Sequence, residues 1–402
     1  MTIAIQHLRV VTGQGNTLER TTVLIDDGRI AGLGPDRSLR IPRGATRLDG
    51  RGLTALPGLI DCHVHLCLGA EADVVGATEK ESPALSLVKA TDLARRTIEA
   101  GFTTVRDVGF RDHGVFALKR AIDGGLTPGP RIVAAGLAIC MPGGHARFIG
   151  REAEGVEAVK AAVQDQLAAG AEVIKVIASG GVLTPGTSPD QAQMTVEELT
   201  AAVQLAVAHG RHVAAHAHGA SGMKNALRAG VHSIEHGTLL DDDAGRMMAE
   251  RGVFMVPTLS ALATTAACPA GCGIPDSARD KARSMVKQHE KSFRAALRRG
   301  VPIALGTDAG TPFNYHGENA QELERMVALG MTPMEAIMAA TSSAARLLRL
   351  DQEIGSIVPG KRADLLFVEG NPLKNITLLR RKERIAGVMQ RGHFVAGPLA
   401  ST

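Results

Sequence analysis

Imidazole and carboxylate side chains stand where strongly apolar segments of the chain end. The segment "LIDCHVHL" carries His63 and His65, which are two residues apart and therefore point to the same side of a strand. Later apolar segments end in His216, His236 and Asp308. Histidine nitrogens and carboxylate oxygens bind divalent metal ions that perform hydrolysis, zinc first among them. The pattern predicts a metal site with open coordination positions.

A lysine interrupts another apolar segment, "VIKVI" at 173–177, which has the β-branched composition of a buried parallel strand. Burial disfavours the ammonium form of Lys175 and favours the neutral amine. A neutral amine can add carbon dioxide to give a carbamate, a two-oxygen anion that can bridge two metal ions. With Asp308 and a bridging hydroxide, it would leave two divalent ions a small positive excess. The alternative is a lysine that extends to solvent or pairs with Glu172.

These side chains need a fold that brings the ends of several strands together. Eight apolar, strand-like segments alternate with amphipathic helical segments over residues 56–350, and several helical segments end in glycine. This order predicts an α/β fold of the (β/α)8 TIM-barrel type, in which active sites lie at the carboxyl ends of the strands. The third predicted strand is "RIVAAGLAI" and the eighth is "VPIALGTDAG".

The two ends of the chain have a different pattern. Short alternating segments broken by glycine and aspartate occupy both ends, which predicts a small β-sandwich domain built from both termini. We therefore expect residues 1–55 and 351–402 to form the sandwich and residues 56–350 to form the barrel.

Composition excludes several classes of protein. Hydrophobic residues make up 45% of the 402 residues, enough for a sizeable core. A net charge of +4 without a basic block, and 2% aromatic residues, argue against nucleic-acid binding. No apolar run reaches the roughly 18 residues of a membrane helix, and "MTIAIQHLRVV" does not resemble a signal peptide. We expect a cytoplasmic protein with a small-molecule substrate and no nucleic-acid or membrane partner.

The five cysteines are an odd number and are scattered, which predicts reduced thiols. Cys268 and Cys272 in "CPAGC" have a spacing known from zinc sites. No second pair of cysteines or histidines follows at a matching distance, so we do not expect a metal there.

Five motifs, in order along nearly the whole chain, resemble the amidohydrolase superfamily: "GLIDCHVHL", "VIKVIASGG", "VAAHAHG", "SIEHG" and "ALGTDAGTP". The closest likeness is to its imidazolonepropionase-like and Xaa-Pro-dipeptidase-like members. The tail "EIGSIVPGKRADLLFVEGNPL" is similar to the superfamily's return to its β-sandwich. Similar enzymes assemble, so we expect a homo-oligomer.

The resemblance implies a binuclear metal site, usually zinc. One metal would be held by His63, His65 and Asp308, and the other by His216 and His236, with carboxylated Lys175 (N6-carboxylysine) as bridging ligand. Asp308 would also be the general base that takes the proton of the attacking bridging hydroxide and passes it to the leaving amine. The presence of Lys175 favours the peptidase-like branch over true imidazolonepropionase.

Three further residues are candidates for substrate binding. His145 in "PGGHAR" follows the third strand and is either a substrate contact or a surface histidine. His218 shares strand parity with His216 and is either a substrate contact or an alternative ligand. Tyr315, in the loop "TPFNYHGEN", either lines the pocket or packs within its loop.

The predicted function is hydrolysis of an amide or peptide bond in a small carboxylate-bearing substrate, a dipeptide such as Xaa-Pro or an N-acyl amino acid. Arg106 and the adjacent Asp107 are expected to form a structural ion pair, and contact of Arg106 or Arg147 with the substrate carboxylate is the alternative. The same site would also serve a cyclic-amide, carbamate or aryl-amide hydrolase. A remote alternative is a non-catalytic scaffold of the same fold, which we would expect to have lost ligands.

Overall fold

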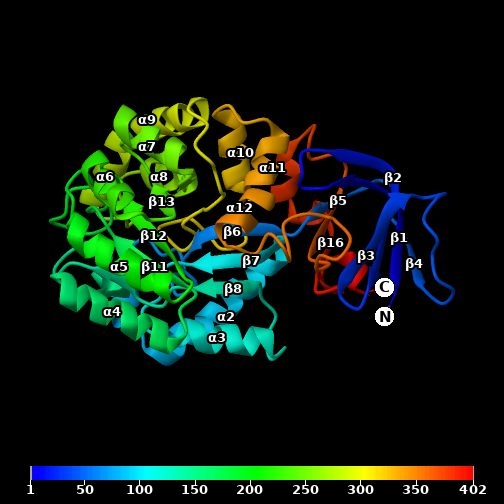
Figure 1. Ribbon diagram of the computed structural model, residues 1–402, viewed down its shortest axis with the longest axis horizontal. Coiled ribbons are helices and arrows are strands. Elements are labelled where there is room, and N and C mark those ends of the chain that lie inside the picture. The colour runs from blue at the N-terminus through cyan, green and yellow to red at the C-terminus, as the bar shows by residue number, and fades with distance from the viewer. Residues whose placement is uncertain (1, 402) are drawn as a thin grey trace.

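Strands from both ends of the chain share one sheet. The computed structural model describes residues 2–401, and its eight-stranded sheet has the order β17-β16-β15-β5-β1-β2-β3, with β4 paired to β1. Figure 1 shows the N-terminal strands (blue) beside the C-terminal segments (red). The sequence predicts a sandwich, and the structure has a β domain whose strands form one connected sheet. The strands are β1 (Ile3–Val11), β2 (Thr17–Asp26), β3 (Arg29–Pro35), β4 (Thr46–Asp49), β5 (Leu53–Pro57), β15 (Leu365–Glu369), β16 (Ile385–Gln390) and β17 (His393–Ala396).

Two parallel sheets form the α/β part of the molecule. The three-stranded sheet has the order β6-β7-β8, and the six-stranded sheet has the order β10-β9-β11-β12-β13-β14. Helices lie around the outside of these strands (Figure 1). The strands are β6 (Leu59–Val64), β7 (Phe102–Asp107), β8 (Arg131–Ala134), β9 (Ala138–Cys140), β10 (Gly150–Glu152), β11 (Val173–Ile177), β12 (His212–Ala217), β13 (Ser233–His236) and β14 (Phe254–Val256).

Local sequence signals set many helix boundaries. Thr195 and Glu198 form a capping box at the start of α5, and Gly170 and Gly230 end α4 and α6 in the left-handed conformation. Among the described residues, no helix is both long enough and apolar enough to cross a membrane. The α-helices are α1 (Val74–Lys80), α2 (Pro83–Glu99), α3 (Gly114–Asp123), α4 (Val156–Ala169), α5 (Val196–Ala208), α6 (Ala220–Ala229), α7 (Asp242–Arg251), α8 (Leu259–Ala267), α9 (Asp276–Arg298), α10 (Gln321–Ala328), α11 (Pro333–Ala339) and α12 (Ser342–Leu347). Short 3₁₀ helices cover η1 (Arg147–Ile149), η2 (Ile376–Arg380), η3 (Lys382–Arg384) and η4 (Pro398–Ser401).

Two predicted strands differ from the structure. The third is split into β8 and β9, because Gly136 between them has a φ of 76°. The eighth, at 301–310, has only isolated bridges within the described chain, to β14 through Ile303 and to β6 through Ala309. Pro302 has no N–H to donate, and Asp308 has a φ of 59°, so a regular ladder cannot form along this segment. Mostly parallel sheets and covering helices are thus established, and closure of a complete eight-stranded barrel stays a prediction.

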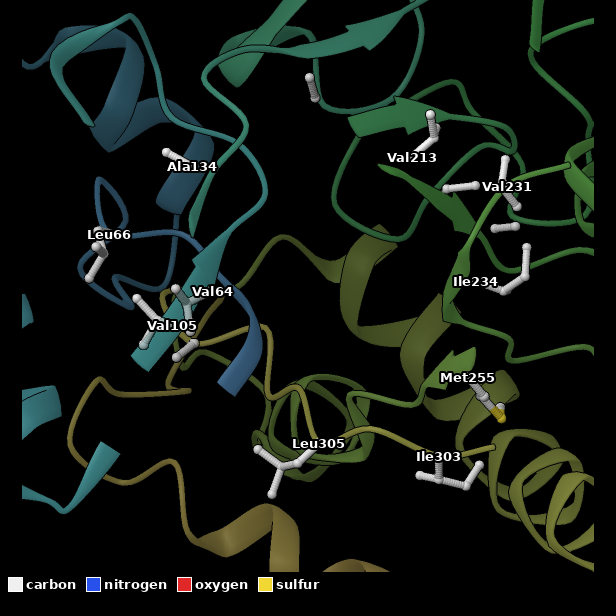
Figure 2. Packing of buried hydrophobic residues seen from close by; sticks show 14 of the residues in the cluster. Val64, Leu66, Val105, Ala134, Val213, Val231, Ile234, Met255, Ile303 and Leu305 are labelled. Carbon is white, nitrogen blue, oxygen red and sulfur yellow. The ribbon is translucent and has the colours of Figure 1, made fainter. Parts of the chain in front are cut away.

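Apolar side chains from both parallel sheets meet in one hydrophobic cluster. Figure 2 shows Val64 and Val105 from the three-stranded sheet, Val213 and Ile234 from the six-stranded sheet, and Ile303 beside Met255 of β14. Buried β-branched side chains of this kind are typical of parallel sheets covered on both faces. The cluster fixes the strands, and with them the residues at the strand ends.

A disulfide corrects the prediction of five reduced thiols. Cys268 and Cys272 are bonded, with their Cα atoms 6.2 Å apart, which is within the ordinary range for a disulfide. They approach because α8 ends just before Cys268 and the chain turns there. Cys62, Cys67 and Cys140 are free and buried.

Candidate metal centre

All six residues predicted as metal ligands line one cavity. The four histidines lie at or next to the carboxyl ends of β6, β12 and β13, Lys175 lies in the middle of β11, and Asp308 lies in the segment 301–310; each is at most 8% exposed. The six are His63, His65, Lys175, His216, His236 and Asp308. Strand direction alone therefore brings together residues that are up to 245 positions apart in the sequence, from His63 to Asp308.

His63, His65 and Asp308 form the first of two ligand groups, with one ligand atom from each residue within 4.8 Å of the others. Asp308 Oδ1 lies 3.5 Å from His63 Nε2 and 3.2 Å from His65 Nε2. His63 donates from Nδ1 to Glu235 at 2.8 Å, and His65 donates from Nδ1 to the Gly109 carbonyl at 2.8 Å. Both rings therefore direct Nε2 toward Asp308, which raises the pKa of His65, and a cation held between the three groups would be stabilised there.

The charge state of Asp308 suits a ligand or a base. Burial acts to raise the pKa of this carboxyl, but the imidazoles of His63 and His65 outweigh burial and lower it to about 2. Burial lowers the pKa of His63 to about 4. At neutral pH the site thus holds an ionised carboxylate beside neutral His63, as metal ligation requires.

His216, His218 and His236 form the second group. His216 Nδ1 lies 2.9 Å from His236 Nε2. The other nitrogens of these two rings contact the Gly180 carbonyl at 3.3 Å and the Thr258 hydroxyl at 2.7 Å. Two ring nitrogens this close need a proton or a metal ion between them. Burial lowers the pKa values of both rings well below the ordinary value, which favours the neutral, metal-binding form.

Lys175 lies on β11, which pairs with β12, the strand that carries His216. Its side chain is 3% exposed, and its Nζ has no hydrogen-bond partner among residues 2–401. Burial lowers its pKa to about 8. Glu172 pairs instead with Lys119 at 3.1 Å, so the alternative of a Lys175–Glu172 pair is wrong. A buried amine without a partner, facing the same cavity as both ligand groups, fits a lysine that accepts carbon dioxide and then binds metal.

The structure treats the three substrate-binding candidates differently. His145 and His218 line the cavity, where their Nδ1 atoms contact Thr184 at 2.9 Å and Thr238 at 2.7 Å, respectively. Tyr315 does not reach the cavity: its side chain is 47% exposed. The loop instead buries the next residue, His316, which donates from Nε2 to the carbonyl of the candidate ligand His65 at 3.1 Å.

The predicted ion pair between Arg106 and Asp107 is wrong. Neighbouring residues of a strand point to opposite faces, so their side chains separate. Arg106 pairs with Glu235 at 2.8 Å, and both side chains are 0% exposed. Arg147 is exposed and does not line the cavity. Sequence reasoning missed Glu235, for which the available signal was an acidic residue inside an apolar strand, directly before His236.

The rest of the cavity lining is mostly apolar. Within the described chain, no arginine lines it, and Lys175 is its one amine. The loop after β9, the loop after β11 and helix α8 contribute Phe148, Ile149, Val182, Leu183, Ala261 and Leu262. Such a wall favours an apolar group on a bound molecule.

Comparisons with known proteins give a family and several relatives. The sequence model described as "Amidohydrolase family" matches residues 54–395. The chain is 31% identical to ochratoxinase of Aspergillus niger over 97% of its own length and 85% of the relative. It is 27% identical to imidazolonepropionase of Rubrobacter xylanophilus, over 94% and 92% of the two chains. A solved Xaa-Pro dipeptidase with methionine bound in the active site shares 37% identity and a TM-score of 0.92, covering 99% of this chain and 100% of that one.

Proposed function

Because the chain belongs to the amidohydrolase family and is a hydrolase acting on carbon–nitrogen bonds, we propose that it cleaves the amide bond of a small dipeptide, such as Xaa-Pro, or of an N-acyl amino acid. The observation that carries the proposal is the pair of buried ligand groups that face one cavity together with the unpartnered amine of Lys175. Similarity over full length to an Xaa-Pro dipeptidase supports the dipeptide substrate.

The proposed site holds two divalent metal ions, zinc first. His63, His65 and Asp308 would hold one, and His216 and His236 would hold the other, with carboxylated Lys175 as the shared ligand. When bound, the metal pair supplies a strong nucleophile from water at neutral pH and polarises the amide carbonyl. His218 lies in the second group and serves either as a further ligand or as a substrate contact.

Asp308 is the proposed general base. Its carboxylate is ionised at neutral pH and lines the cavity beside His63 and His65. It accepts the proton that water loses on attacking the carbonyl and delivers this proton to the nitrogen of the leaving amine. Hydrolysis then yields one carboxylic acid and one amine, and Asp308 returns to its ionised form.

The apolar wall sets the proposed substrate preference. Phe148, Leu183 and Leu262 would pack against an apolar side chain of the substrate, while His145 and His218 contact its polar groups. Arg106 and Arg147 do not line the cavity, so they do not meet a substrate carboxylate. Because these apolar side chains would also pack against an aromatic ring, aryl amides are the second candidate substrate class, ahead of cyclic amides and carbamates.

A substrate panel with metal-loaded and chelated protein tests the proposal. We expect turnover of dipeptides and N-acyl amino acids with apolar side chains, loss of turnover on chelation, and loss of turnover in Asp308→Asn. Activity confined to lactams, carbamates or aryl amides would replace the proposed substrate class by the alternative. Less than one bound metal per chain, with no hydrolysis of any substrate, would favour the scaffold.

Two properties of the whole chain complete the proposal. We retain the cytoplasm as the proposed location, although the Cys268–Cys272 disulfide removes reduced thiols as support for it. We also retain a homo-oligomer, which light scattering coupled to gel filtration would measure directly.

A further inference from the structure

Glu235 is fully buried and contacts the candidate ligand His63 without lining the cavity. Its carboxylate is 0% exposed, and each oxygen has a defined partner. Oε2 accepts from His63 Nδ1 at 2.8 Å, while Oε1 accepts from Ser233 Oγ at 2.5 Å and from Arg106 at 2.8 Å. A carboxylate held on both oxygens fixes the position of the imidazole that donates to it.

Backbone geometry explains how Glu235 and His236 reach the same centre from adjacent positions. Consecutive side chains of a strand normally point to opposite faces. His236 has a φ of 70°, in the left-handed region, and it ends strand β13. Glu235 contacts His63, and His236 contacts His216, so adjacent residues serve the two ligand groups.

Arg106 makes the burial of this carboxylate possible. It donates to the Cys62 carbonyl at 2.6 Å, to Ser233 Oγ at 3.2 Å and to Glu235. The opposite charges cancel, so the pair adds no net charge beneath the metal ligands. An unpaired carboxylate at this depth would be strongly destabilising.

We infer that Glu235, anchored by Arg106 and Ser233, is a positioning residue for metal binding: it holds the His63 ring as the Nδ1–H tautomer and directs Nε2 toward Asp308. The inference rests on the proposed function, because it needs a metal at the His63 group. Glu235 does not touch the cavity and acts only through His63.

Glu235→Gln tests this role with nearly unchanged volume. Loss of the negative charge should weaken zinc or cobalt binding by about 10- to 100-fold, the usual effect of removing such a partner. Excess metal should restore most of kcat with little change in KM, and the cobalt absorption spectrum should shift. Asp364→Asn is the matched control, since Asp364 is also a buried carboxylate paired with an arginine, Arg131 at 3.1 Å, but lies outside the cavity lining.

Metal affinity in Glu235→Gln equal to that of the wild type, with an unchanged cobalt spectrum, would overturn the inference while leaving the proposed function intact. A wild-type protein that binds no metal and hydrolyses nothing would overturn both. If Glu235→Gln does not fold, Ser233→Ala is the second test, because it removes one hydrogen bond to Glu235 and leaves the charge of Glu235 in place. Its metal affinity should then fall in the same direction by a smaller factor, and an unchanged affinity would count against the inference.

Discussion

The buried amine of Lys175 is evidence for the candidate site at the scale of a single residue. A buried polar group without a hydrogen-bond partner destabilises a folded protein by about 1–3 kcal/mol. The Lys175 amine is such a group, and it lies in a strand whose other members are apolar. An amine in that position is best accounted for by a chemical role in the cavity it faces.

Replacing Lys175 distinguishes its proposed role in metal binding from its effect on the stability of the fold. Lys175→Met should lower metal content toward one ion or none and reduce kcat by more than about 100-fold, because the shared ligand is lost. The metal-free variant should nevertheless unfold at an equal or higher urea concentration, since no amine remains buried without a partner. Metal analysis, kinetics and urea unfolding by circular dichroism measure the three effects.

Lys119→Ala is the control for this substitution, because Lys119 pairs with Glu172 outside the cavity. It should keep its metals and its turnover. Reconstitution of metal-free wild-type protein should depend on bicarbonate, the source of the carbamate. Full activity and two metals in Lys175→Met would show that the carbamate is not a ligand.

Residue types and spacing were enough to predict which side chains meet in one cavity, and not enough to predict the residues that hold them in place. His63, His216 and Asp308 could be found because the ends of parallel strands meet at one edge. An acidic residue directly before His236 was a local signal for Glu235, but its partners Arg106 and His63 could not be predicted, because they are more than 100 positions away in the sequence. The alternation of residues along a strand predicts the side of the sheet to which a side chain points, but it does not predict which residue the side chain contacts.

At the scale of elements, the regular strands were predictable and the interruptions were not. The β-branched run of β11 is read directly from the sequence, whereas the eighth segment is held by isolated bridges on its two sides. The course of a loop is also unpredictable from local sequence, because tertiary contacts decide it. Phe313 has a φ of 58°, and the loop after it exposes Tyr315 and buries His316.

Helix α8 depends on a partner from another element. Its N-cap residue, Thr258, makes no side-chain cap. Glu322 of α10 instead accepts from the backbone N–H groups of Leu259 at 2.7 Å and Ser260 at 2.8 Å. Burial raises the pKa of Glu322 from 4.5 to about 7. Because α8 lines the cavity, this contact links a titrating group to the shape of the apolar wall.

The raised pKa of Glu322 predicts a pH-dependent stability. Between pH 4.5 and about 7 the folded chain holds this proton more tightly than the unfolded chain, so its stabilisation is complete below pH 4.5 and is lost as pH rises through 7. The free energy of unfolding of wild type relative to Glu322→Gln should fall by up to about 3 kcal/mol across this range. Urea unfolding at a series of pH values measures the difference.

The exposed Glu197 supplies the control, since Glu197→Gln should show no comparable trend over the same range. A difference between wild type and Glu322→Gln that is independent of pH would show that Glu322 titrates near its ordinary value. Any pH dependence of the free energy of unfolding of the wild type would then have to be assigned to other groups.

At the scale of the whole molecule, the candidate metal centre joins parts of the chain that backbone ladders leave separate. His63 and His65 belong to the three-stranded sheet, whereas Lys175, His216 and His236 belong to the six-stranded sheet. Asp308 comes from the segment that forms isolated bridges to both sheets. Metal ions bound at this place would therefore act as cross-links between the two sheets.

Metal removal should consequently weaken the fold as well as abolish activity. A ligand that binds only the folded state stabilises it by about 2.7 kcal/mol at 100 times its dissociation constant, so chelation should lower Tm and zinc should restore it. Hydrogen exchange should quicken in β6 and in β12 together, because both lose the same cross-link. His216→Asn is the matched control, and chelation should change its Tm less than that of the wild type. If Tm and exchange in the wild type were unaffected by chelation, the two ligand groups would not share a metal centre, whatever their spacing in the empty cavity.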